Sequence, residues 1–171
     1  MPAIEFTRRF AMAHRLLADP ASKCATPHGH NEFVTVTLET DAAPQWGGSN
    51  LALDFEVLKR RWHGWIDGAV DHALQLNARD PLVGFFREQE PQRLPRLMLF
   101  DGDPTTEAAA VGFRRKLLAF LRQDAPGWRC TRLRLEETPT NAVTLEGDRE
   151  FAAGWAPGAW CDRADATIND L

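Results

Sequence analysis

Residues Asn31–Thr40 read NEFVTVTLET, and the expected fold is built around this segment. It is rich in β-branched and aromatic residues and alternates along its length, which predicts a β-strand. Successive side chains of a strand point to opposite faces, so the stretch carries two sets of side chains. One face carries Phe33, Thr35, Thr37 and Glu39, and the other carries Val34, Val36, Leu38 and Thr40. The chain is therefore expected to be organised around a sheet.

The segments on either side of this strand extend the pattern. Glu5–Leu16, EFTRRFAMAHRL, also alternates and predicts a preceding strand. Asp19–Pro27 holds two prolines and several small residues, which is typical of a turn. Downstream, residues 53–70 repeat apolar residues at spacings of three and four, which predicts a helix. Asp54 is its expected N-cap.

The second half of the chain supplies further elements. We expect a short helix over Pro81–Glu90, a short strand over Leu97–Phe100, a helix over 105–123 that starts at Thr105, and strands over Arg129–Thr138 and Asn141–Glu146. The main elements follow the order β-β-α-α-β-β, which predicts the α+β class: a four-stranded antiparallel sheet with two helices on one face. The last residues, about 147–171, are expected to be an irregular extension of a single domain whose core spans about 4–146.

Composition and charge limit the function classes. The chain has 171 residues, with 44% hydrophobic and 26% charged residues, which is ordinary globular composition. The formal net charge is −4, which argues against non-specific nucleic-acid binding. No apolar run reaches the ~18 residues of a membrane helix. The N-terminus lacks the build of a signal peptide, and the three cysteines are sparse, so we expect a reduced, cytoplasmic protein without membrane partners.

Three histidines are the first candidate functional group. His28 and His30 form an H-x-H pair, whose imidazoles would point to one face of an extended strand. His14 lies near the end of the preceding predicted strand and would meet them if the two strands form a hairpin. Three neutral imidazoles suit Zn²⁺ with a fourth position open. A lone H-x-H is more often only a pair of half-exposed strand residues, so the pair alone does not establish a site.

Cys24 precedes this pair by four residues and allows three interpretations. It is a buried hydrophobic residue, a thiolate favoured by the positive field of Lys23, or the fourth ligand of a closed Cys-His₃ zinc site. The sequence does not separate these interpretations.

Two acidic positions complete the candidate set. In a turn, a carboxylate such as Asp71 can orient His72 as a base or proton relay. Glu137 falls on the apolar face of its predicted strand, where an unpaired carboxylate is unfavourable. It either binds a guanidine-like edge of a ligand or forms an internal salt bridge, for example with Arg8 or Arg15.

Together these motifs resemble one family. The matching pieces are Phe10-x-Ala-x-His14-Arg15-Leu16, Lys23-Cys24-x₃-His28-Gly29-His30-Asn31, Asp54-Phe55-x₂-Leu58-Lys59, Asp71-His72, Pro104-Thr105-x-Glu107 and Glu137-Thr138. They occur in the order found in the 6-pyruvoyltetrahydropterin synthase and 6-carboxytetrahydropterin synthase family. The resemblance covers roughly residues 4–145.

The resemblance implies a fold, an assembly and a set of roles. It implies the tunnelling fold and a homo-hexamer built from two trimers, with active sites at subunit interfaces. It implies zinc as the cofactor, with the metal ligands His14, His28 and His30. The implied catalytic residues are Cys24, Asp71 and His72, of which the last two typically act from a neighbouring subunit. The implied substrate contacts are Glu137, Thr105, Thr106 and Glu107.

The resemblance also implies two alternative lyase reactions on 7,8-dihydroneopterin triphosphate. The first yields 6-carboxytetrahydropterin, acetaldehyde and triphosphate, on the route to queuosine and other deazapurines. The second yields 6-pyruvoyltetrahydropterin by elimination of triphosphate. The three-residue gap between Cys24 and His28 resembles the carboxy-forming bacterial type and favours the first reaction. A non-catalytic zinc- or pterin-binding paralogue is the third alternative.

Overall fold

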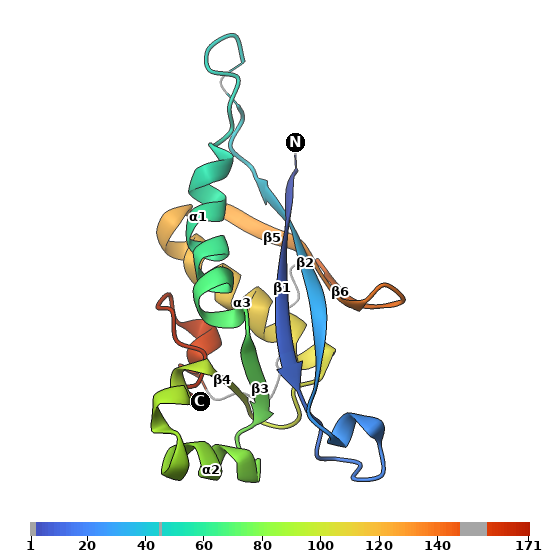
Figure 1. Ribbon diagram of the computed structural model, residues 1–171. Coiled ribbons are helices and arrows are strands. Elements are labelled where there is room, and N and C mark those ends of the chain that lie inside the picture. The colour runs from blue at the N-terminus through green and yellow to red at the C-terminus, as the bar shows by residue number, and fades with distance from the viewer. Residues whose placement is uncertain (1–2, 45, 148–156) are drawn as a thin grey trace.

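One sheet of six strands organises the chain (Figure 1). The computed structural model describes residues 3–44, 46–147 and 157–171. The strands are β1 (Ile4–His14), β2 (His28–Thr40), β3 (Ala73–Asn77), β4 (Leu97–Phe100), β5 (Trp128–Thr138) and β6 (Asn141–Glu146). Their order across the sheet is β4-β3-β1-β2-β5-β6. β1, β2, β5 and β6 pair antiparallel, whereas β3 and β4 extend the sheet in parallel from the end of β1.

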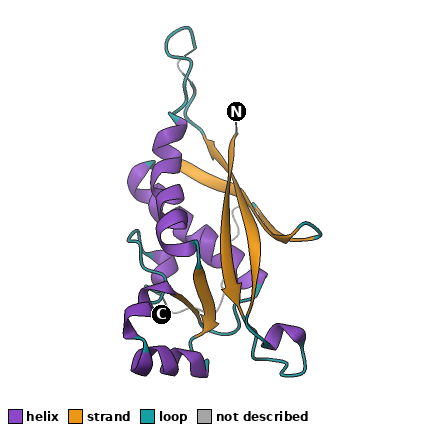
Figure 2. Cartoon of the chain, viewed as in Figure 1, coloured by secondary structure: helices purple, strands orange, loops and turns teal. Residues whose placement is uncertain are grey.

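Helices cover one face of this sheet (Figure 2). They are α1 (Phe55–Trp65), α2 (Pro81–Gln89) and α3 (Thr106–Asp124), joined by the short helical turns η1 (Lys23–Ala25), η2 (Ile66–Val70), η3 (Pro91–Arg96) and η4 (Trp160–Asp162). Asp54 caps α1 through the Glu56 amide, and Thr105 caps α3 through the Ala108 amide. Both predicted helix starts are therefore confirmed.

The core lies between the sheet and the two long helices. Val34, Val36 and Leu38 of β2 are fully buried there, which confirms that this side of the predicted strand faces inward. Aromatic side chains of the helices pack against them: Trp62, Trp65, Phe113 and Phe120. The other face of β2 carries Thr35, whose hydroxyl bonds that of Thr7 at 2.8 Å. The face of the sheet that the helices cover is thus apolar through its middle. The polar residues at the end of this face form the candidate site.

The observed sheet corrects the prediction in strand number and pairing. The expected α+β class with helices on one face is confirmed, but the sheet has six strands rather than four and is not wholly antiparallel. β3 was not predicted, because five residues are too few to show a period of two clearly. The predicted strand Leu97–Phe100 is confirmed, and it pairs parallel with β3. This pair packs with Val83 of α2 in a separate small cluster.

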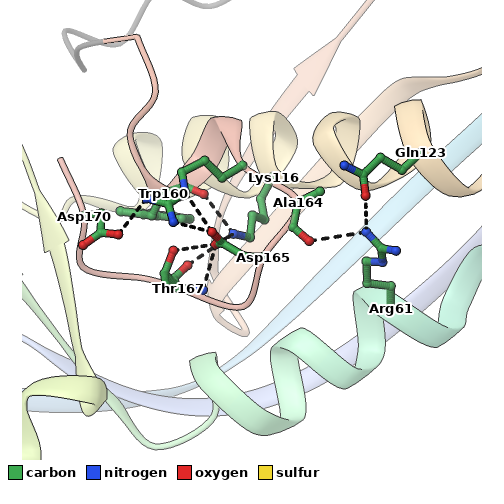
Figure 3. Close-up of polar contacts among 9 residues, drawn as sticks. Arg61, Lys116, Gln123, Trp160, Ala164, Asp165, Thr167 and Asp170 are labelled. Carbon is green, nitrogen blue, oxygen red and sulfur yellow. Dashed lines mark hydrogen bonds and ion pairs between the residues drawn. The ribbon is translucent and has the colours of Figure 1, made fainter.

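The C-terminal segment, residues 157–171, packs on α3 and on the outer edge of β4 (Figure 3). Trp160 and Cys161 are fully buried, and the indole of Trp160 donates to the carbonyl of Leu99 at 2.8 Å. The amide of Leu99 donates to the carbonyl of Ile168 at 3.0 Å. Trp155 lies outside the described residues. Over residues 157–171, the extension that was predicted to be irregular therefore covers the core and the edge of the sheet.

None of the helices in the described ranges has the length and apolar composition that a membrane span requires.

Candidate active site

The three histidines predicted as metal ligands lie together. β1 and β2 form the expected hairpin pair, in which His14 lies opposite His28 and Met12 lies opposite His30. The ring centroids are 4.5–5.2 Å apart, and one ring nitrogen from each histidine lies within 4.8 Å of the other two. The hairpin that the sequence left conditional is thus confirmed.

Backbone carbonyls fix the protonation of two of these rings. Nδ1 of His14 lies 3.0 Å from the carbonyl oxygen of Pro104, and Nδ1 of His28 lies 2.9 Å from that of Thr26. A carbonyl oxygen only accepts, so each Nδ1 carries a proton, and in the neutral ring the lone pair is then on Nε2. The two Nε2 atoms are 3.1 Å apart. Burial lowers the pKa of His14, which favours its neutral form.

This arrangement fits a bound cation. Two lone pairs at 3.1 Å repel each other unless a positive centre lies between them. Nε2 of His30 is buried without a hydrogen-bond partner among the described residues. Metal-binding histidines commonly donate their second ring N–H to a carbonyl, as His14 and His28 do here. The three histidines could therefore hold a metal ion, and imidazole donors suit zinc.

Glu137 lies against the histidine cluster. Its Oε1 is 3.9 Å from Nε2 of both His14 and His30 and accepts a hydrogen bond from the Thr106 hydroxyl at 2.9 Å. On the side facing β6 the register shifts between Glu136 and Thr138, so Glu137 sits at a bulge. Bulges near functional sites re-aim side chains.

The salt bridges considered for Glu137 are not formed in the described part of the chain. Arg8 pairs with Asp67, with Nη2–Oδ2 at 2.5 Å. Arg15 pairs with the buried Asp80. Glu137 therefore keeps a carboxylate for another partner, in agreement with a ligand-binding role and against the alternative of an ion pair with either arginine.

The α3 N-terminus forms one wall of the site. Thr105 uses its side chain as the helix cap, and Thr106 holds Glu137. Glu107 is exposed in the first turn of the helix. Of the three predicted contacts in this segment, the structure brings Thr106 to Glu137 and leaves Glu107 pointing to solvent.

Cys24 lies in the short turn η1 between the two histidine-bearing strands. Its amide donates to the Ser22 hydroxyl at 3.1 Å, and its carbonyl accepts from the Leu16 amide at 2.8 Å. The thiol is half-buried and free of disulfides. In the part of the chain that is described, it does not belong to the group whose donor atoms lie within 4.8 Å. The geometry thus favours an open three-histidine site over a closed Cys-His₃ site.

Asp71 and His72 form the expected carboxylate–imidazole pair, at 2.8 Å between Oδ2 and Nδ1. His72 adopts a positive φ of 64°, and this turn geometry lets neighbouring side chains meet. Asp71 also accepts from the Ala11 amide at 2.7 Å, which is the main cause of its lowered pKa. The His72 ring is 79% exposed and borders a depression along β1, lined also by Thr7, Arg9 and Asn31.

Within the described residues, no hydrogen bond or ion pair joins His72 to Cys24 or to the histidine cluster. The depression is lined both by Thr7, Arg9 and Asn31, which alternate with the histidine face, and by Arg8, Phe10 and Asp67, so it lies along the edge of β1 and does not include the clustered histidines. A single chain therefore does not assemble all of the predicted catalytic residues.

Sequence reasoning missed Glu32. It is 1% exposed, and its Oε2 has no hydrogen-bond partner among the described residues. Burial, and then the charge of Glu137, raises the pKa of Glu32 to about 8. The signal was its position two residues after His30, on the same strand face, where a carboxylate needs an explanation.

Comparisons with known proteins agree with this geometry. Residues 3–148 match the family model described as 6-pyruvoyl tetrahydropterin synthase. The 6-carboxy-5,6,7,8-tetrahydropterin synthase of Rickettsia bellii (strain RML369-C) is 27% identical over 144 residues, which cover 83% of this chain and 99% of that relative.

Solved structures share the fold. An uncharacterized protein, WS1659, of Wolinella succinogenes aligns with a TM-score of 0.67 at 21% identity, over 85% of this chain and 97% of that chain. The 6-pyruvoyl tetrahydropterin synthase of Caenorhabditis elegans aligns with a TM-score of 0.53 at 26% identity, over 86% of this chain and 97% of that chain. The family match spans both histidine-bearing strands and Glu137. The chain belongs to the 6-pyruvoyl tetrahydropterin synthase family.

Proposed function

We propose that this chain, a lyase of the tetrahydropterin synthase type, is a zinc-dependent 6-carboxytetrahydropterin synthase. It converts 7,8-dihydroneopterin triphosphate and water to 6-carboxy-5,6,7,8-tetrahydropterin, acetaldehyde and triphosphate. The observation that carries the proposal is the cluster of His14, His28 and His30 with Glu137 3.9 Å from two of its members. The Rickettsia relative, named for this reaction, and the three-residue gap between Cys24 and His28 support the carboxy-forming choice.

Glu137 positions the ring of the substrate in this mechanism. Its carboxylate accepts from the N–H groups of the amino-pyrimidine edge, while Thr106 holds one of its oxygens. A ring held at Glu137 stays beside the histidine cluster, because the carboxylate borders that cluster, and this supports catalysis by proximity. Zinc, when bound, supplies Lewis-acid polarisation of the oxygens on that substituent.

Cys24 and the Asp71–His72 pair move the protons. The Cys24 thiolate removes and returns protons on the carbon chain of the substrate, and triphosphate leaves by elimination. The bond between the first two side-chain carbons then breaks with the addition of water, which leaves a carboxyl group on the ring and releases the other two carbons as acetaldehyde. Asp71 holds the His72 ring through Nδ1, so the other ring nitrogen is free to relay these protons. His72 is mostly exposed in its own chain, which supports its action in the site of a neighbouring subunit.

Open strand edges support an assembly of several copies. β3 pairs only with Met12–His14 of β1, so the edge of residues 4–10 has no strand partner among the described residues. β6 ends the sheet on the other side. Antiparallel joining of these edges would close sheets from several copies, in line with the proposed hexamer of two trimers. Three free cysteines in the described chain support a reducing, cytoplasmic location.

Product analysis tests the proposed function. Zinc-loaded protein is incubated with 7,8-dihydroneopterin triphosphate, and pterin products and acetaldehyde are identified by mass. We expect acetaldehyde with 6-carboxytetrahydropterin, and no product from Cys24→Ala. Cys130→Ala is the matched control, because that thiol is buried in the core. Intact substrate with folded, zinc-loaded protein would contradict both synthase reactions and leave a binding role.

The sibling reaction is the second candidate. The C. elegans structure of the same fold is named 6-pyruvoyl tetrahydropterin synthase, as is the family model. A 6-pyruvoyl product without acetaldehyde would move the assignment to that reaction.

A further inference from the structure

The proposed mechanism leaves one buried carboxyl without a function. Glu32 is 1% exposed, and its Oε2 lacks a hydrogen-bond partner among the described residues. A buried polar atom in this state is unfavourable, because it has lost its hydrogen bonds to water and gained none in the folded chain. Folded proteins retain few such groups, and those retained commonly serve a function. Oε2 of Glu32 therefore needs a hydrogen-bond donor that the described residues do not supply.

The strand register directs Glu32 into the candidate active site. His28, His30 and Glu32 alternate along β2, so their side chains share the helix-covered face. On the neighbouring strand, Phe33 pairs with Glu136, and the next position in this register places Glu32 opposite Glu137. Side chains directly opposite each other in antiparallel strands have Cβ atoms about 4.5–5.5 Å apart. Two carboxyls thus lie side by side at the end of the apolar core.

Two neighbouring carboxyls are poorly suited to a role in the fold alone. Like charges at facing positions of a sheet destabilise it, and among the described residues no lysine or arginine pairs with either carboxyl. A ligand edge with several N–H donors would satisfy both. Glu32 is also outside the group of donor atoms within 4.8 Å, which argues against its being a metal ligand.

We propose that Glu32 is a second ligand-contacting carboxyl, which hydrogen-bonds an N–H of the amino-substituted ring held by Glu137 and so favours 2-amino over 2-oxo pteridines. This inference rests on the proposed function and names a specificity residue for that same site. Buried hydrogen-bonding groups discriminate strongly, because a ligand that lacks the donor leaves the protein group unpaired.

Calorimetric titration with pterin and with lumazine tests the proposal, because these rings differ by an amino or an oxo group at carbon 2. The variant Glu32→Met keeps the side-chain length and removes the carboxyl. We expect pterin affinity to fall about tenfold or more, the pterin-to-lumazine preference to narrow, and zinc content to stay unchanged. We also expect unfolding to need at least as much denaturant as in the parent, because an unpaired buried carboxyl is gone.

Two controls separate the possible failures. Glu136→Gln changes the adjacent carboxyl on the opposite face, which pairs with Arg134, and should bind pterin as the parent does. If the parent binds pterin and Glu137→Gln does not, but Glu32→Met binds normally or loses zinc, this inference alone is overturned. If the parent does not bind pterin, the proposed function fails as well. Should Glu32→Met not fold, Glu32→Leu, which also lacks an acceptor, carries the same test with the same threshold.

Discussion

Arg15 directly follows a histidine of the cluster, yet its guanidinium is committed elsewhere. Its Nε donates to Oδ2 of Asp80 at 2.7 Å, and its Nη2 donates to the other oxygen of the same carboxylate. The Asp80 side chain is fully buried, and its Oδ1 also accepts from the Leu82 amide at the start of α2. This two-point pair ties the end of β1 to α2, next to the site.

The variant Asp80→Asn tests how much that pair contributes to the free energy of unfolding. Asparagine still caps α2 but no longer offers a carboxylate to Arg15. We expect the free energy of unfolding to fall by about 2–3 kcal/mol, because a buried charge-assisted bidentate contact is lost. Denaturant titration measures it. Asp101→Asn is the matched control, since its pair with Arg79 is mostly exposed and should contribute under ~1 kcal/mol. Equal effects of the two changes would contradict this account.

The sequence alone was enough to predict the residues of the site, but not the groups that surround them. His14, His28, His30 and Glu137 were predicted because residue type and alternation are local properties, and the structure places them together. The carbonyl of Pro104 that orients His14 is 90 residues away in the chain, and such a contact has no local signal. Glu32 was missed for a related reason: its burial depends on β5 and the helices, not on its own strand.

At the level of elements, the pairing of β1 with β2 positions the histidine cluster. Gly29 lies between two members of that cluster, His28 and His30, and opposite Ala13 of β1. A Cβ added to Gly29 would meet the carbonyl oxygen of Met12 at 2.7 Å. The neighbouring backbone would have to move, and that backbone carries His28 and His30 on one strand and leads to His14 on the other.

Gly29→Ala should therefore weaken both the pairing and the site. We expect a loss of about 1–3 kcal/mol in the free energy of unfolding, together with weaker zinc retention against a chelator. Gly84→Ala in α2 is the matched control, because its added Cβ meets no atom within 4 Å. That change should stabilise the chain slightly, by about 0.5–1 kcal/mol. A neutral effect of Gly29→Ala on both stability and zinc would contradict the proposed constraint.

Lys116 of α3 holds the C-terminal segment by its buried ammonium group (Figure 3). Its Nζ donates to the carbonyls of Trp160 at 2.9 Å and Thr167 at 3.2 Å, and lies 3.6 Å from Asp165. Burial lowers the pKa of Lys116 to about 8. The unfolded chain returns this group to its ordinary value near 10.5.

A pH dependence of stability follows from this shift. Between pH 8 and 10.5 the unfolded chain binds more protons at this lysine than the folded chain, so its contribution to the free energy of unfolding rises with pH. Below pH 8 that contribution is flat. Lys116→Met should remove this rise, whereas Lys59→Met, at a partly exposed position on α1, should keep it. Denaturant unfolding at several pH values measures the difference, and identical slopes for the parent and Lys116→Met would refute it.

The six strands were only partly predictable as elements. β2 and the long helices show clear periods over ten or more residues, and their caps are local. β3 has five residues, and its parallel place beside β1 depends on a crossover through α1. Pairing across such a distance is set by how the helices pack, which the sequence pattern does not encode locally.

At the scale of the whole molecule, the chain separates its predicted catalytic groups. Cys24 lies between the histidine-bearing strands, whereas the His72 ring is exposed beside β1 at the depression that includes Arg9 and Asn31. The edge of β1 along residues 4–10 and the last strand, β6, are both open among the described residues. A neighbouring copy joined there would supply the missing half of each site.

Mixing two inactive variants tests this division. We expect Cys24→Ala and Asp71-His72→Ala-Ala each to lose turnover, and a refolded mixture to regain part of it, because some interfaces then combine an intact Cys24 with an intact His72. The same mixture prepared with Cys24→Ala alone is the control. If a mixture that is shown to form mixed oligomers recovers no turnover, Cys24 and His72 act within one chain.

X-ray absorption at the zinc edge tests whether the three histidines form an open zinc site. We predict one zinc per chain with three nitrogen ligands at about 2.0–2.1 Å and no sulfur, in both the parent and Cys24→Ala. A sulfur ligand at about 2.3 Å that disappears in Cys24→Ala would instead show a closed structural site. Absence of stoichiometric zinc from the folded protein would rule out a zinc site at these histidines.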